Sequence, residues 1–238
     1  RNDFFEKTKE LGLKTKDLIV PPGEVRELLS LASDLHYLHL SDSLPKDIIK
    51  RLKNQEGFQG VRYEIAVATS LIRGGFTIKW TNSHNTNKKI HEFDAFQSYT
   101  NETIAIEAKS KRRTGTLHYG GNLPDFNEIK KLDIFPLLND AKKQNPNNKP
   151  FGIFIDINLP RPASMVNSRL TWKDLYLDKY NKEGDSILGD NPPAFLAITN
   201  SAWHYDKENL AQNTEYLWTI SEPSKVKFPL NEVVTFHS

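Results

Sequence analysis

Three residues in the middle of the chain have types and spacing that suit hydrolysis of a phosphate ester: Asp94, Glu107 and Lys109. Glu107 and Lys109 lie in TIAIEAKSK (103–111), where they share one face of an extended strand because side chains alternate. Asp94 lies in the preceding strand-like run, EFDAFQSY (92–99). Two carboxylates can bind a divalent cation, and an ammonium group can orient water and stabilise charge at phosphorus. The set suits metal-assisted hydrolysis, provided that the fold brings the three side chains together.

The turn between these strands decides whether the two carboxylates meet. A turn centred on Thr100-Asn101 pairs residues whose numbers sum to 201, and it places Asp94 directly opposite Glu107. Opposed side chains have Cβ atoms about 4.5 to 5.5 Å apart, and like charges there are destabilising. Compensation is therefore expected from a raised pKa, from Lys109 or from a bound cation. Oxygen ligands favour Mg²⁺ or Mn²⁺ over zinc.

The elements that must position these residues follow in the order helix, three strands, helix, strand. The helix at 60–73 has apolar residues in steps of four, three and four, and Gly74-Gly75 ends it. FTIKWT (76–81) precedes the two strands already named. A helix interrupted by Pro136 is expected within 127–144, and FGIFIDINL (151–159) has the composition of a buried strand. This order predicts an α/β fold with a mixed central sheet flanked by helices.

The two ends of the chain differ from this core. Residues 1–56 are rich in Leu and Lys and predict an N-terminal helical region, with helices after Pro21-Pro22 and at 45–53. Residues 161–238 contain two further strand-like runs, PAFLAITNSAWHY (193–205) and EYLWTI (215–220), separated by turn-forming residues. We therefore expect a core at 57–160 and a C-terminal extension that completes the sheet.

The order of elements, together with Asp94 on the second strand and Glu107-Ala108-Lys109 on the third, resembles the PD-(D/E)xK nuclease superfamily. That superfamily includes restriction endonucleases and Holliday-junction resolvases. The resemblance covers roughly residues 57–159. Many members also carry a glutamate on the first core helix, and Glu64 in GVRYEIAVATSL matches it. One departure is Phe93, which stands where the family motif has a proline. The resemblance implies a restriction endonuclease-like core and a metal-dependent DNA endonuclease.

The resemblance also implies a role for each matching residue. Asp94, Glu107 and the carbonyl of Ala108 would bind Mg²⁺, for which Mn²⁺ would substitute. Lys109 would orient or activate the attacking water, and Glu64 would bind metal or water at the edge of the site. Three ordinary interpretations stay open, and the first is that Asp94 is a surface residue of its strand. Glu107 and Lys109 can form a simple ion pair on a half-exposed strand, and a glutamate such as Glu64 is favoured near a helix N-terminus by the helix dipole.

Basic residues near this set predict a surface for phosphate groups. Lys111, Arg112 and Arg113 continue directly from the third strand, and Lys88 and Lys89 lie in the polar loop before the second. Such residues would line one rim of a cleft and neutralise the phosphates of DNA, the expected partner. The alternative is a solvated basic loop.

Composition bounds the remaining possibilities. The chain has 238 residues and no cysteine, which excludes disulfide scaffolds, thiolate-bound metals and cysteine nucleophiles. The net charge of +2 combines +4 from residues 57–160 (14 basic, 10 acidic) with −2 from 161–238 (8 and 10). No apolar run approaches the roughly 18 to 20 residues that cross a bilayer, so no membrane association is expected and the expected location is the cytoplasm. A homodimer is compatible with the sequence, and no nucleotide cofactor is expected.

Two other functions remain compatible with the residues. A catalytically silent module of nuclease fold could bind DNA or a protein partner, although such modules usually lose a carboxylate or the lysine. A nuclease acting on RNA would use the same core chemistry, because that chemistry does not depend on the sugar.

Overall fold

The computed structural model describes residues 21–81, 90–122, 134–160, 171–207, 209, 214–220 and 225–227. Its helices are α2 (Gly23–Leu40), α3 (Ile48–Leu52), α4 (Phe58–Arg73), α6 (Ile134–Lys142), α7 (Trp172–Leu188) and the 3₁₀ helix η3 (Trp203–Tyr205). Its strands are β1 (Phe76–Trp80), β2 (Phe93–Gln97), β3 (Glu102–Ser110), β4 (Phe151–Asp156), β5 (Phe195–Asn200) and β6 (Glu215–Ile220). The predicted order of helix, three strands, helix and strand is confirmed as α4, β1, β2, β3, α6 and β4.

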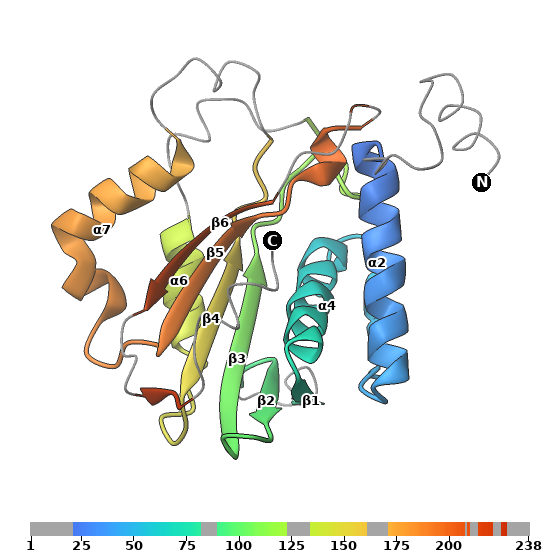
Figure 1. Ribbon diagram of the computed structural model, residues 1–238. Helices are drawn as coiled ribbons and strands as arrows, with labels where there is room; N and C mark the ends of the chain where they lie inside the picture. The colour runs from blue at the N-terminus through green and yellow to red at the C-terminus, as the bar shows by residue number, and fades with distance from the viewer. Residues whose placement is uncertain are drawn as a thin grey trace, which may run out of the picture.

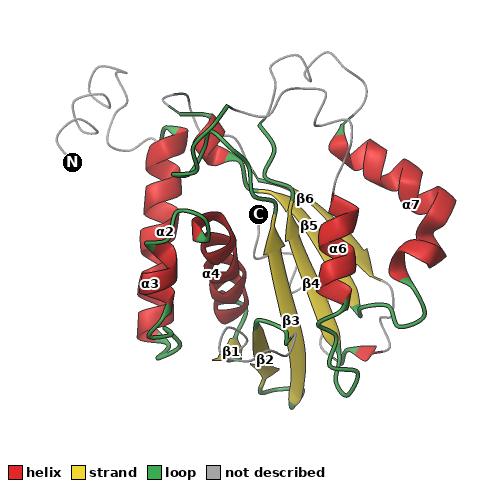
Figure 2. Ribbon diagram, turned by 180° about the vertical axis from the view of Figure 1, so that it is seen from behind, coloured by secondary structure: helices red, strands yellow, loops and turns green. Residues whose placement is uncertain are grey.

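Within the described residues, the strands form one mixed open sheet in the order β1-β2-β3-β4-β5-β6. The first three strands are antiparallel neighbours, β3, β4 and β5 are parallel, and β6 is antiparallel to β5. Helices cover both faces: α2 and α4 lie on one side, and α6 and α7 lie on the other (Figures 1 and 2). The protein is therefore a mixed α/β structure, and β5 and β6 extend its sheet as the sequence predicts.

Helix α4 forms the centre of one face. Its apolar stripe, predicted from the sequence, is buried against β1 to β3 and includes Val61, Ile65 and Ala68, each 2% exposed or less. The helices of the N-terminal region join the same core, since Leu38 of α2 and Ile48 of α3 are fully buried in it. Burying one such side chain stabilises the fold by about 1.5–3 kcal/mol. This packing fixes α4 over the end of the sheet where β3 finishes.

The second face of the sheet packs against α6 and α7. Ala105, Ile153 and Ile155 point into this core from β3 and β4, and Leu138 and Tyr176 meet them from the two helices. Strands β4 and β5 are buried along their whole length, as expected for parallel strands covered on both faces. The sheet is thus enclosed around β4, and polar groups are concentrated at the strand ends.

Two helices differ from the sequence expectation. The helix expected within 127–144 is described as Ile134–Lys142 and continues through Pro136, where an interruption was expected; residues 127–133 lie outside the described part. The sequence pattern predicted no element at α7. The helix is kinked at Glu183, whose φ and ψ are not helical, and Gly184 follows directly. Glycine has a low helix propensity, so it weakens the helical pattern in the sequence. Across the described part of the chain, each helix is too short or too polar to span a bilayer.

A close approach of two strands yields the first prediction. A Cβ added at Gly152 of β4 would lie 2.3 Å from the ring of Phe195 on β5, and that ring is itself packed against Phe154 and Trp218. We expect Gly152→Ala to lower the free energy of unfolding in urea by about 1–3 kcal/mol, because the ring has no room to move. Gly60→Ala in α4 is the matched control. Its Cβ meets nothing within 4 Å, so a gain of about 0.5–1 kcal/mol is expected. Equal free energies of unfolding for the two variants would contradict the close packing of Phe195 against Gly152.

Candidate active site

The hairpin that carries Asp94 and Glu107 has a different register from the predicted one. Its strands are joined by a four-residue loop, 98–101, closed by the pair Gln97↔Glu102, so paired residue numbers sum to 199. Asp94 therefore pairs with Ala105, and the prediction that it lies directly opposite Glu107 is wrong. The turn is centred one residue earlier than expected, and Asn101 at its end adopts the left-handed conformation (φ 52°) that asparagine tolerates. Asp94 still shares a face of the sheet with Glu107, as a diagonal neighbour.

A further acid close to the Glu107–Lys109 pair is Glu92, which was not predicted from the sequence. The last β2–β3 pair is Phe93↔Ile106, and the N–H of Glu92 donates to the carbonyl of Ile106 at 3.0 Å. Glu92 therefore lies against the same residue as Phe93, and the regular register of β2 and β3 does not continue to a Glu92–Glu107 pair. Lys109 forms an ion pair with Glu107, and its Nζ lies 3.6 Å from Oε1 of Glu92. Strand alternation was the missed signal, because Glu92 stands two residues before Asp94.

The carboxyl group of Glu107 is buried and poorly satisfied. The residue is 0% exposed, and neither of its oxygens accepts a hydrogen bond of ordinary geometry. Burial raises the pKa of Glu107 to about 8; Lys109 opposes this rise, while Glu92 and Glu64 add to it. Burial also disfavours the charged form of Lys109, but Glu107 and Glu92 outweigh that effect and raise the pKa of the ammonium. The ammonium of Lys109 is therefore fixed beside the carboxyl group of Glu107, whose oxygens can still accept a cation or a proton.

Glu64 reaches the same end of β3 from α4. It is 6% exposed, and Nη2 of Arg51 donates to its two oxygens at 2.8 and 2.7 Å. Its charge acts on both Glu107 and Lys109. Glu64 is therefore close enough for its charge to act on the Glu107–Lys109 pair. Arg51 lies in α3, outside the expected core, and no local sequence signal identifies it as a partner.

Asp94 has partners of its own. His91 Nε2 lies 2.7 Å from Asp94 Oδ1, and Nζ of Lys149 donates to both carboxylate oxygens at 2.9 Å. Burial would raise the pKa of Asp94, but the bonds from His91 and Lys149 outweigh it and lower that pKa. Lys149 precedes β4 and is 55 residues away in the chain, so only the tertiary structure shows the contact.

The predicted phosphate-contacting residues are distributed differently from the expectation. Arg112 is exposed and stacks over Tyr119 at 4.7 Å, and Lys111 is half-buried beside it. Arg113 is 7% exposed and donates to the carbonyls of Ile157 and Asn158 inside the fold, so the structure does not place it on the predicted rim. Its guanidinium points into the fold, because the two carbonyl groups to which it donates lie just beyond the end of β4. The remaining two, Lys88 and Lys89, lie outside the described residues.

The carboxylate oxygens of this site are chemically suited to bind a hard cation. Oxygen atoms from carboxylates are the ligands that Mg²⁺ and Mn²⁺ prefer, and both oxygens of Glu107 are buried without hydrogen bonds. In their present positions, no three His, Asp or Glu side chains of the described segments stand close enough together to hold a metal ion. Basic groups lie among the acids: Lys109 at Glu107, Lys149 at Asp94 and Arg51 at Glu64. Binding of a cation would have to displace some of these contacts.

Comparisons with known proteins do not assign this site. The chain matches no protein-family model, no curated protein and no solved structure. Its chemistry therefore follows from its own residues: a buried acid–lysine pair, with further acids at one end of a sheet.

The raised pKa of Glu107 predicts a dependence of stability on pH. Because the folded protein binds this proton more tightly than the unfolded chain, the stabilisation is complete below about pH 4.5 and is lost as pH rises through about 8. Glu107→Gln has no proton to lose there. The free energy of unfolding of Glu107→Gln, relative to that of the wild type, should therefore rise between pH 5 and pH 8.5. The rise is at most about 1.4 kcal/mol per pH unit.

Urea unfolding in EDTA at pH 5, 6.5 and 8.5 measures this difference. Asp178→Asn is the control, because Asp178 is an exposed residue of α7 paired only with Lys182 among the described residues. A constant difference between Glu107→Gln and wild type across this range would show that Glu107 is ionised throughout.

Proposed function

We propose that this protein is a metal-dependent endonuclease with a restriction endonuclease-like (PD-(D/E)xK) core, which hydrolyses phosphodiester bonds of DNA. The observation that carries the proposal is the buried Glu107–Lys109 pair at the end of β3. Its carboxylate is fully buried and forms an ion pair with the ammonium of Lys109, which does not outweigh the effect of burial on the pKa of Glu107. A buried carboxylate in such a state is costly for stability alone and is characteristic of a functional site.

The surrounding acids support a cation at this place. Glu92 lies close enough to Glu107 for its charge to act on it, Asp94 is a diagonal neighbour on the same face of the sheet, and the charge of Glu64 acts on Glu107 from α4. These carboxylates, with the carbonyl of Ala108, would hold Mg²⁺. The ion would supply Lewis-acid activation of water and neutralisation of charge on the phosphate.

The basic residues of the site have separate tasks. Lys109, between Glu107 and Glu92, would donate hydrogen bonds that orient the attacking water and stabilise the negative oxygens at phosphorus. Arg51 holds Glu64 in place through two hydrogen bonds. Lys149, once Asp94 turns to the cation, would face the substrate and could neutralise a phosphate. The half-buried Lys111 and the exposed Arg112 extend this basic surface beyond β3.

One observation favours a second candidate, a silent binding module of the same fold. Asp94 is fully engaged by Lys149 and His91 and does not face Glu107 directly. If these bonds persist, the site has too few converging oxygens for catalysis. Titration with Mn²⁺ separates the two functions, because the nuclease should bind the ion through Glu107 while the silent module should show no saturable binding.

Cleavage of DNA tests the proposal directly. With Mg²⁺ or Mn²⁺ the wild type should nick or cut plasmid DNA, and EDTA should stop the reaction. Glu107→Gln, Lys109→Met and Asp94→Asn should each lower the rate by at least about 100-fold, the effect of removing one group that stabilises charge in the transition state. Full activity in any of these three would contradict the assignment of the site.

Two further comparisons refine the experiment. Glu92→Gln tests whether the acid beside Lys109 takes part, and a loss similar to that of Asp94→Asn is expected because Glu92 acts on both Glu107 and Lys109. Lys182→Ala, an exposed substitution on α7, should leave the rate unchanged. Matched DNA and RNA strands decide the substrate, and faster cleavage of RNA would overturn the assignment to DNA.

A further inference from the structure

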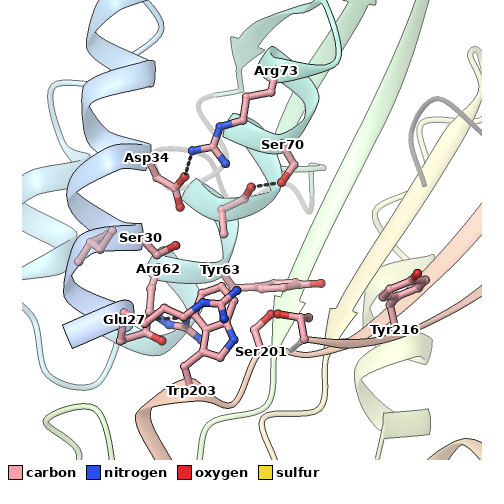
Figure 3. A pocket seen from close by; sticks show the side chains of 14 residues that line it. Glu27, Ser30, Asp34, Arg62, Tyr63, Ser70, Arg73, Ser201, Trp203 and Tyr216 are labelled. Atoms are coloured by element: carbon pink, nitrogen blue, oxygen red, sulfur yellow. Dashed lines mark hydrogen bonds and ion pairs between the residues drawn. The ribbon is translucent and has the colours of Figure 1, made fainter. Parts of the chain in front are cut away.

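A second polar pocket lies on the other side of α4. It has a volume of about 380 Å³ and is bounded by α2, α4, the segment after β5 and the start of β6 (Figure 3). Arg62, Glu27 and Trp203 converge at one end, and the pair Arg73–Asp34 forms the other. Its lining includes none of the candidate active-site residues. Volumes of roughly 300–1,000 Å³ are typical of small-molecule sites, so a ligand of modest size fits.

The central cation of this pocket is Arg62, which is 5% exposed. Its Nη1 donates to Oε1 of Glu27 at 2.6 Å, and its Nη2 lies 3.7 Å from Oδ2 of Asp156. Neither Nε nor Nη2 has a hydrogen-bond partner within the described part of the chain. Burial opposes the charge of Arg62, but Glu27 and Asp156 outweigh it and raise the pKa of the guanidinium. Arg62 is thus a fixed, charged group, with Nη1 bonded to Glu27 and with Nε and Nη2 enclosed by the fold.

Two further guanidinium groups stand in the walls. Arg26 of α2 stacks over the ring of Trp203 at 4.4 Å, which holds its plane in one orientation. Arg73 at the end of α4 donates to Asp34 at 2.9 Å, and its side chain is 35% exposed. Three guanidinium groups therefore face two carboxylates in the lining, a net charge of +1.

This arrangement favours an anion with several oxygens. Guanidinium groups bind phosphate and carboxylate through paired N–H donors, and a tetrahedral phosphate can accept from several directions at once. A carboxylate would engage only one such fork. The hydroxyl groups of Ser30 and Ser201 add donors in the same lining, and Trp203 adds a flat apolar wall.

The topology of the sheet supports a ligand at this place. Ser201 and Trp203 directly follow β5, and Asp156 ends its parallel neighbour β4. In open α/β sheets, ligands bind outside the carboxyl ends of parallel strands. The pocket lies at that edge, between the strand ends and the helices that cover them.

We propose that the α2–α4 pocket binds a phosphate monoester, either a free mononucleotide or the 5′-phosphate at the end of a nucleic-acid strand. Arg26, Arg62 and Arg73 recognise the phosphate, and Trp203 contacts the remainder of the ligand. The site is independent of the proposed nuclease activity, since it requires neither a divalent cation nor any residue of the Glu107 site.

Isothermal titration in EDTA at neutral pH and constant ionic strength tests the site with four probes. These are deoxyadenosine 5′-monophosphate, deoxyadenosine, and one short single-stranded DNA with and without a 5′-phosphate. The nucleotide should bind with a dissociation constant below about 1 mM, and the nucleoside should bind at least about tenfold more weakly because it lacks the anion. Binding of the phosphorylated strand but not of the mononucleotide would assign the site to strand ends. Binding of the mononucleotide alone would assign it to a free nucleotide.

Variants link this binding to the pocket. Arg26→Ala and Arg73→Ala should weaken it by at least about tenfold, because each removes a donor to the phosphate. Asp34→Asn should tighten it several-fold, because a negative charge leaves the lining and Arg73 is released toward the ligand; loss of folding could not produce this gain. Lys182→Ala should change nothing. The proposal is overturned if no phosphate-bearing probe binds saturably up to about 10 mM, or if binding is the same in Arg26→Ala, Arg73→Ala and wild type.

Discussion

The buried guanidinium of Arg62 connects the layers of this molecule. From α4 it donates to Glu27 on α2 and lies close to Asp156 at the end of β4. Asp156 is fully buried and accepts hydrogen bonds from the hydroxyl of Ser110 on β3 and the N–H of Ser201 after β5. Burial raises the pKa of Asp156, and Arg62 opposes that rise. Because a buried charge without its partner costs about 3–5 kcal/mol, this network holds α4 in one position over the ends of three strands.

That position of α4 separates two polar regions. Arg62 and Glu64 are two residues apart, so they point about 200° apart around the helix axis. Arg62 faces α2 and the pocket of Figure 3, while Glu64 is turned toward the end of β3, where its charge acts on Glu107 and Lys109. One helix therefore supplies an arginine to the proposed phosphate pocket and an acid to the candidate active site.

The candidate active site is a set of acids, each held by a nearby base. Lys109 contacts Glu107 and Glu92, Arg51 contacts Glu64, and Lys149 with His91 contacts Asp94. Glu107 is the most deeply buried of these acids, and burial outweighs the effect of Lys109, so the pKa of Glu107 is raised.

The sequence by itself determined most of the elements, although not α7, and the faces of the strands. Alternation placed Glu107 and Lys109 on one side of β3, and helical spacing identified the apolar stripe of α4, because both patterns depend only on neighbours in the chain. The same alternation could have identified Glu92. Tertiary structure alone decided the register of the hairpin, because a shift of one residue in the turn changes every cross-strand pair without altering any local pattern. It also decided the partners Arg51 and Lys149, which reach the acids across 13 and 55 residues of chain through the packing of α3 and the approach to β4. Long-range charge pairs of this kind depend on where whole elements lie, and no local spacing encodes that.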